Sequence, residues 1–130
     1  IINTCNYTSY FIDSNGNLYT CGANNNGLNG INHDSSYCYG SNKKYKLKRI
    51  NPSNDVLFDN IKVGRQHVIA LTNKNKLYSW GTNMFGECGQ GYSKDEIYKP
   101  TKIKFSNNNI KVDNYFCLHY SNIIIDTNNE

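Results

Sequence analysis

The chain has 130 residues, the size of one ordinary domain, and a mild formal net charge of +4. Apolar residues make up 38% of it and are interleaved with polar ones, which excludes a wholly disordered chain. No apolar run, Ile123-Ile124-Ile125 included, is long enough to cross a bilayer, so no membrane partner is expected.

The five cysteines are an odd number and form no C-x-x-C pair. This spacing argues against a disulfide framework and against a zinc ribbon. We therefore expect free thiols in a reducing compartment, which predicts an intracellular protein, cytoplasmic or nuclear.

Short segments rich in β-branched and aromatic residues, bounded by Asn, Gly and Asp, predict β-strands along the whole chain. The strands are expected near residues 9–12, 18–21, 46–50, 68–71, 77–80, 101–105 and 122–125. No stretch carries apolar residues at helical spacing over three turns, so any helix should be short. The sequence predicts an all-β fold.

One pattern occurs twice, 59 residues apart: residues 18–30 reappear as residues 77–89. A leucine, a tyrosine, a small hydroxyl residue, an asparagine and three glycines fall in register, and residues 120–126 match residues 7–13. A fixed period of this kind predicts a repeat architecture. The repeats divide the chain into a degenerate first copy (1–56), a second copy with the best motif (57–109) and the start of a third (110–130).

The residues of the second copy point to one family. The runs are Gly64-Arg65-Gln66-His67-Val68-Ile69-Ala70-Leu71-Thr72, Leu77-Tyr78-Ser79-Trp80-Gly81-Thr82-Asn83, Gly86-Glu87-Cys88-Gly89-Gln90-Gly91 and Lys99-Pro100-Thr101-Lys102-Ile103. Together they closely resemble one full repeat of the regulator of chromosome condensation family. In the first copy Cys5, Thr8, Cys21 and Leu47 replace Gly64, His67, Trp80 and Pro100.

The resemblance implies β-propeller blades, each a four-stranded antiparallel sheet, within a partial ring. In the family seven blades close the ring, and this chain supplies under half of that. A partial ring leaves apolar blade sides uncovered. We therefore expect either that the natural protein is longer or that copies of the chain associate with one another.

The residues that recur in the repeats are assigned structural roles. They are Gly22, Gly27, Gly30, Gly64, His67, Trp80, Gly81, Gly86 and Gly89. His67 has no nucleophile at a recognisable spacing, and His33 with Cys38 is too small a ligand set for a metal. The glycine runs lack the following helix that a phosphate loop needs. No catalytic, cofactor-binding or metal-binding residue is assigned.

One basic cluster is a candidate partner-binding site. It consists of Lys43, Lys44, Tyr45, Lys46, Lys48 and Arg49. Such a cluster can bind phosphates or an acidic protein face, but the favoured interpretation is a lysine-decorated edge strand. Nucleic-acid binding is thus the weaker alternative.

The resemblance implies a non-enzymatic protein-interaction module with a scaffold or regulatory role. The alternative that it implies is a guanine-nucleotide exchange factor for a Ran-like small GTPase with chromatin association; no residue here is assigned to exchange. Repeated residues build blades, so partner choice should lie where the copies differ. Those segments are residues 31–45, 51–60 and 91–99.

Overall fold

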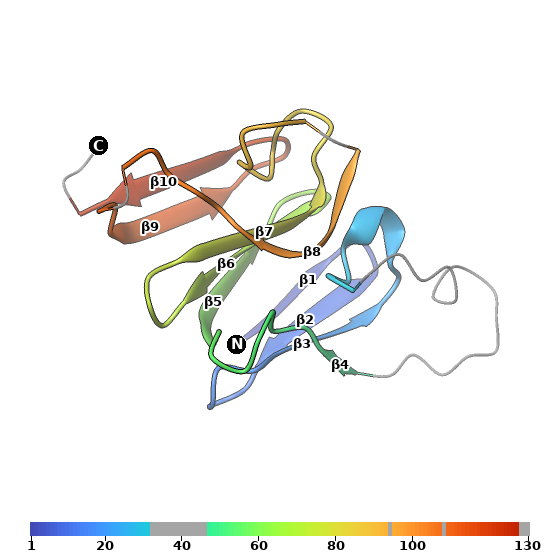
Figure 1. Ribbon diagram of the computed structural model, residues 1–130. Coiled ribbons are helices and arrows are strands. Elements are labelled where there is room, and N and C mark those ends of the chain that lie inside the picture. The colour runs from blue at the N-terminus through green and yellow to red at the C-terminus, as the bar shows by residue number, and fades with distance from the viewer. Residues whose placement is uncertain (32–46, 94, 108, 128–130) are drawn as a thin grey trace.

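In this computed structural model, residues 1–31, 47–93, 95–107 and 109–127 are described, and they form three antiparallel sheets that lie side by side in chain order (Figure 1). The first sheet contains β1 (Ile2–Cys5), β2 (Thr8–Ile12), β3 (Leu18–Gly22) and β4 (Lys48–Arg49). The second contains β5 (Phe58–Val63), β6 (His67–Thr72), β7 (Leu77–Thr82) and β8 (Glu96–Lys102). The third contains β9 (Val112–Cys117) and β10 (Asn122–Asp126), and a short 3-10 helix, η1 (Asn25–Gly27), follows β3.

Each sheet is a meander, in which every strand pairs with the next one along the chain. The expected hairpin between residues 68–71 and 77–80 is present as β6 and β7, with Leu71 opposite Leu77. The expected all-β architecture is confirmed. Among the described residues, no helix is long and apolar enough to cross a membrane.

Two equivalent glycines let the third strand of a sheet pass close to the turn that joins its first two strands. Gly22 and Gly81 have φ values of 108° and 103°, which side chains rarely adopt. A Cβ atom would lie 2.1 Å from the Tyr7 carbonyl oxygen at the first glycine and 2.5 Å from the Gln66 carbonyl oxygen at the second. Backbone crowding therefore explains why the repeat has glycine here.

The hydrophobic core fills the spaces between neighbouring sheets. Tyr10, Leu28 and Trp80 are buried between the first sheet and the second. Ile69 and Tyr115 belong to a second cluster, between the second sheet and the third. Burial of these apolar and aromatic side chains fixes how the sheets lie against one another.

Three strands were not expected from the sequence, namely β1, β5 and β9. They are the first strands of their sheets, and they contact one another across the sheet boundaries. These strands show no regular apolar pattern, because some of their positions carry polar side chains. Some of those side chains form hydrogen bonds with the neighbouring sheet. Asn3 Nδ2 donates to the Ile61 carbonyl at 3.3 Å, and Lys62 Nζ donates to the Tyr115 carbonyl at 2.7 Å.

Two expected strands have different bounds. The strand expected at residues 101–105 is β8, which begins at Glu96 and contains Pro100. Proline is tolerated because β8 is the outermost strand, where its missing N–H interrupts no ladder on the far side. The strand expected at residues 46–50 is confined to Lys48–Arg49, and residue 46 lies outside the described part.

Candidate interaction surface

Three neighbouring hairpin turns lie in a row at one end of the sheets. They are residues 6–7 between β1 and β2, residues 65–66 between β5 and β6, and residues 119–120 between β9 and β10. The Asn6 side chain donates to the Arg65 carbonyl at 2.8 Å, and Arg65 Nη1 donates to the Tyr120 hydroxyl at 2.5 Å. We call these six residues the tip row.

Large apolar side chains of the tip row and the adjoining loop are exposed. Tyr7 is 82% exposed, and Met84 and Phe85, in the loop after β7, are 58% and 71% exposed. The Phe85 ring packs edge-on against Tyr120, with 5.3 Å between the ring centroids. Aromatic and arginine side chains that project together are typical of protein-binding surfaces.

A partly buried pair of hydrogen bonds supports this surface from below. His67 Nε2 lies 2.7 Å from Asn122 Oδ1, and the Asn122 amide donates to the Glu87 carbonyl. These hydrogen bonds connect β6, β10 and the loop after β7. Burial lowers the pKa of His67 below its ordinary value of 6.5, while the bond to Asn122 and the charge of Glu87 act in the opposite direction.

The loop after β7 is also fixed from within. Asn83 is fully buried, accepts a bond from the Cys88 N–H at 2.9 Å and donates to the Tyr92 carbonyl at 2.8 Å. Glu87, only 3% exposed, accepts the Phe85 N–H at 2.8 Å. Phe85 is therefore presented by a loop whose backbone is held on both sides.

Trp80 links the second sheet to the first rather than serving the surface. Its indole N–H donates to the Leu28 carbonyl at 2.9 Å, and Tyr10 donates to the same oxygen at 2.6 Å. A Cβ atom at Gly30 would lie 3.2 Å from the Trp80 ring nitrogen. Of the remaining glycines of the repeat, Gly27 is the last residue of η1, and Gly86 and Gly89 lie in the loop after β7.

The basic cluster is described only in part. Lys43, Lys44, Tyr45 and Lys46 lie outside the described residues, as do His33 and Cys38. Lys48 is exposed on the outermost strand of the first sheet, β4. Arg49 donates to Asn17 Oδ1 at 2.8 Å and to Asn54 Oδ1 at 3.0 Å. The described part of the chain holds no group of three or more metal-ligating side chains.

Sequence reasoning missed Arg65, Phe85, His119 and Tyr120. It placed partner choice in the longer segments that differ between copies, whereas the tip row uses two-residue turns. A signal was present, because all three copies differ at the first turn position, and the second copy differs from the other two at the second position. The first position has Asn6, Arg65 and His119, and the second has Tyr7, Gln66 and Tyr120.

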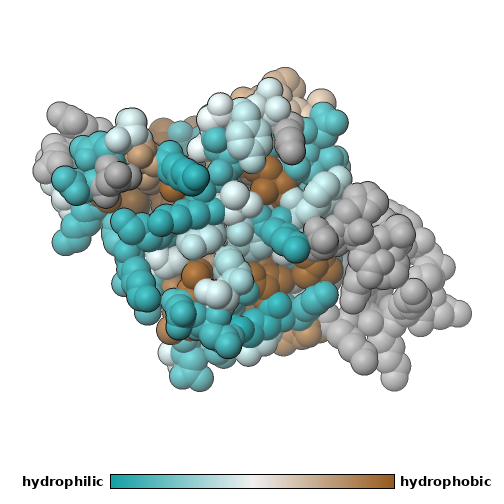
Figure 2. All heavy atoms as spheres, viewed as in Figure 1, coloured by the Kyte–Doolittle hydropathy of each residue, from teal (hydrophilic) through white to brown (hydrophobic). Residues whose placement is uncertain are grey.

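A hollow of about 300 Å³ lies between the second sheet and β10, beside the tip row. Phe85 and Tyr120 line one part of it, and Ile103, Phe105 and Ile124 line another. Figure 2 shows one face of the molecule, on which hydrophilic side chains cover most of the described surface and hydrophobic ones appear in hollows between them.

Comparison with protein families finds a match that runs from the turn before β7 to the end of β9. Residues 74–117 match the model of the regulator of chromosome condensation (RCC1) repeat. The chain is 36% identical over 109 residues to a bifunctional serine/threonine-protein kinase/NEDD4-like E3 ubiquitin-protein ligase of Dictyostelium discoideum, covering 82% of this chain and 6% of that protein. It is 34% identical over 71 residues to the guanine nucleotide exchange factor SRM1 of Saccharomyces cerevisiae, covering 51% of this chain and 15% of that protein.

Solved structures share the fold. The crystal structure of Prp20p from Saccharomyces cerevisiae, reported with its binding properties to Gsp1p and histones, superposes with a TM-score of 0.77. It is 23% identical, and the superposition covers 95% of this chain and 30% of that one. This chain therefore spans a small part of the relatives and about a third of the solved neighbour.

Proposed function

Because this chain is built of β-propeller repeats of the regulator of chromosome condensation family, we propose that it is a protein-interaction module that binds partner proteins through the tip row. The observation that carries this proposal is the exposure of Tyr7 and Phe85 on short, well-held loops. Exposed aromatic side chains on a rigid scaffold bury area on binding at little entropic cost. We propose a scaffold or regulatory role for the module.

The proposed role is non-enzymatic, although one relative, of which this chain covers 6%, is named as a bifunctional serine/threonine-protein kinase and E3 ubiquitin-protein ligase. Burial raises the pKa of the Cys88 and Cys117 thiols to about 12, so neither supplies a thiolate near neutral pH. All four described cysteines are free thiols, which supports an intracellular location, nuclear or cytoplasmic.

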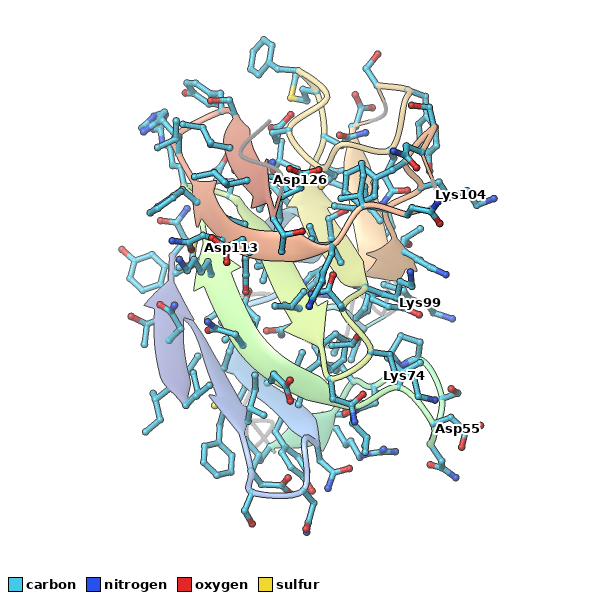
Figure 3. All side chains as sticks on the ribbon, turned by 90° about the vertical axis from the view of Figure 1, so that its left-hand side faces the viewer. Asp55, Lys74, Lys99, Lys104, Asp113 and Asp126 are labelled. Atoms are coloured by element: carbon cyan, nitrogen blue, oxygen red, sulfur yellow. The ribbon has the colours of Figure 1, made fainter. Side chains whose placement is uncertain are left out.

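Site-specific photocrosslinking tests the proposal. A photoreactive phenylalanine analogue replaces Tyr7, Phe85 or Lys74 in separate variants of the full protein expressed in its own cells. Lys74 is the matched control, because it is exposed in the turn between β6 and β7, at the opposite end of the second sheet (Figure 3). We expect the same partner protein crosslinked from positions 7 and 85 and not from position 74. Equal labelling at all three positions would contradict a specific surface.

A second candidate function is nucleotide exchange on a Ran-like small GTPase, with chromatin association. The match to an exchange factor over 71 residues favours it, as does the fold shared with Prp20p. Exchange would use binding energy to release the nucleotide and would need no covalent chemistry. A nucleotide-release assay with the full-length protein and a Ran-like GTPase separates the two: no acceleration at micromolar protein leaves the scaffold role alone.

A further inference from the structure

The Arg65 side chain is held in position, but only part of its hydrogen-bonding capacity is used. Its Nη1 atom donates to the Tyr120 hydroxyl at 2.5 Å and lies 3.0 Å from His119 Nε2. A guanidinium carries five N–H groups in a planar fork. The N–H groups on Nε and Nη2 have no partner among the described residues, and Arg65 is exposed.

Aromatic packing holds this guanidinium in place before any ligand arrives. It lies 5.8 Å from the centroid of the Tyr120 ring, and Phe85 packs on the same tyrosine. The Asn6 side chain fixes the Arg65 backbone from the other side, through the carbonyl oxygen. A side chain held in this way loses little conformational freedom on binding, and arginine matches a carboxylate in bidentate geometry.

The charge of the surface selects an acidic ligand. Arg65 and His119 are both exposed, and neither forms an ion pair with a described carboxylate. In the loop after β7, Glu87 is buried, and its Oε2 atom accepts the Phe85 N–H. An incoming carboxylate therefore meets an unneutralised cation flanked by Tyr120 and Phe85.

Tyr7 supplies an independent sign that the row is used for binding. Asn6 and Tyr7 have φ values of 41° and 66°, so both are in the left-handed region. A two-residue turn of this kind favours glycine at its second position, and a tyrosine there costs stability. The Tyr7 side chain is 82% exposed, so folding gains little contact in return.

We propose that the tip row binds an acidic segment of a partner protein, with a carboxylate on the free edge of Arg65 and apolar side chains against Tyr120, Phe85 and Tyr7. The inference rests on the proposed interaction function and adds the chemistry of the partner. Binding is expected to weaken as ionic strength rises, because the anchoring contact is a charge pair at an exposed site.

Fluorescence anisotropy with defined peptides tests this. The probe is a labelled synthetic peptide in which Asp and Leu alternate in a Gly/Ser background; its control has Asn in place of each Asp. We expect the full chain to bind the acidic peptide with a dissociation constant below about 1 mM. Arg65→Gln should weaken binding about tenfold or more, and the Asn peptide should lose a similar factor. Lys74→Gln, which removes an equal charge at the far end, should leave affinity within about twofold.

Tyr7→Gly provides a second readout. It should weaken peptide binding and raise the urea midpoint of unfolding, because glycine suits the turn. The proposal would be overturned if Arg65→Gln bound the acidic peptide as tightly as the native chain does. It would also be overturned if the native chain did not bind that peptide at concentrations up to about 1 mM. Arg65-dependent binding of a single-stranded oligonucleotide without binding of the peptide would overturn it as well. If the crosslinks from positions 7 and 85 persist in that case, the interaction function stands and only the acidic partner is rejected.

Discussion

At the residue scale, two departures from the repeat compensate for each other. Gly64 faces His67, and a Cβ atom at Gly64 would lie 2.2 Å from the imidazole Cε1 atom. In the first sheet, Cys5 faces Thr8 at the equivalent place. Cysteine is larger than glycine and threonine is smaller than histidine, so the cysteine is tolerated because the histidine is absent.

A double-mutant cycle tests this compensation. Gly64→Cys alone should lower the free energy of unfolding by about 1–3 kcal/mol, because the thiol overlaps the His67 ring. Gly64→Cys with His67→Thr should be less destabilised than the sum of the single changes by about 1–2 kcal/mol. Urea unfolding measures all four proteins. Additive effects would show that the two positions do not share this space.

The protonation of His67 predicts a pH dependence of stability. The Asn122 amide donates to Glu87, so its oxygen faces His67, and the neutral ring carries its proton on Nε2. Nδ1 is buried and has no hydrogen-bond partner. Because the folded pKa lies below the ordinary 6.5, the unfolded state binds the proton more readily. Stability should therefore be full above pH 6.5 and fall as the pH drops through that value.

His67→Gln should remove this part of the acid sensitivity. The free energy of unfolding of the native chain should fall between about pH 7.5 and about pH 5.5, and the variant should show a smaller fall. His33 and His119 remain in both proteins and serve as an internal control. An identical pH dependence in the two proteins would place the proton uptake elsewhere.

At the element scale, hydrogen bonds join successive sheets, and the acceptor differs between the two boundaries. Between the first two, the Phe58 N–H donates to the Gly16 carbonyl at 2.9 Å. Between the second and third, the Val112 N–H donates to the Asn75 side-chain oxygen at 2.7 Å, and the Asn75 amide returns a bond to the Val112 carbonyl at 3.0 Å. Asn75 has a φ of 55°, and Gly16 has one of 79°.

Asn75→Gly tests the two hydrogen bonds between Asn75 and Val112. Glycine is compatible with the turn conformation and removes both side-chain hydrogen bonds. We expect it to lower stability by about 1–2 kcal/mol and to accelerate hydrogen exchange at the Val112 amide. Asn73→Ala, in the same exposed turn, is the control and should leave exchange at Val112 unchanged. Slow exchange in the glycine variant would mean that other contacts hold β9.

The sequence predicted the strands that carry several apolar residues in a row and missed those in which polar residues separate the core-facing ones. β6 and β7 carry runs of buried residues, and both were expected. β1 and β9 bring asparagine and aspartate among their apolar residues, so no single period marks them. The family motif supplied the four-stranded sheets, because its glycines recur in register.

The tip row could not be assembled from sequence. Arg65 and Tyr120 are 55 positions apart, and they meet because the second and third sheets place their first turns side by side. Pattern reasoning identifies residues that recur, whereas the position of Arg65 carries a different residue in each copy. The basic cluster is a contiguous run and was easily seen; most of it lies outside the described residues.

At the scale of the whole molecule, the third sheet differs from the other two because its second strand is an edge strand. β2 and β6 each pair on both sides, whereas β10 pairs with β9 alone among the described residues. Ile123 of β10 is 49% exposed, and Ile124 and Ile125 are half-buried. An unpaired apolar edge of this kind recruits another strand.

The division of the chain into repeats at 1–56, 57–109 and 110–130 stays a prediction.

We expect the 130-residue chain to self-associate through the edge of β10. Light scattering should show the mean mass rising with concentration between about 10 and about 300 μM, where weak association through a single edge becomes populated. Ile123→Lys should suppress the rise, because a charged side chain on an edge strand opposes pairing. Met84→Lys places the same charge on an exposed apolar position near the tip row, and it should leave the rise unchanged. Suppression by Met84→Lys alone would instead assign self-association to the loop surface, and a monomer at every concentration would show that β10 needs no partner strand.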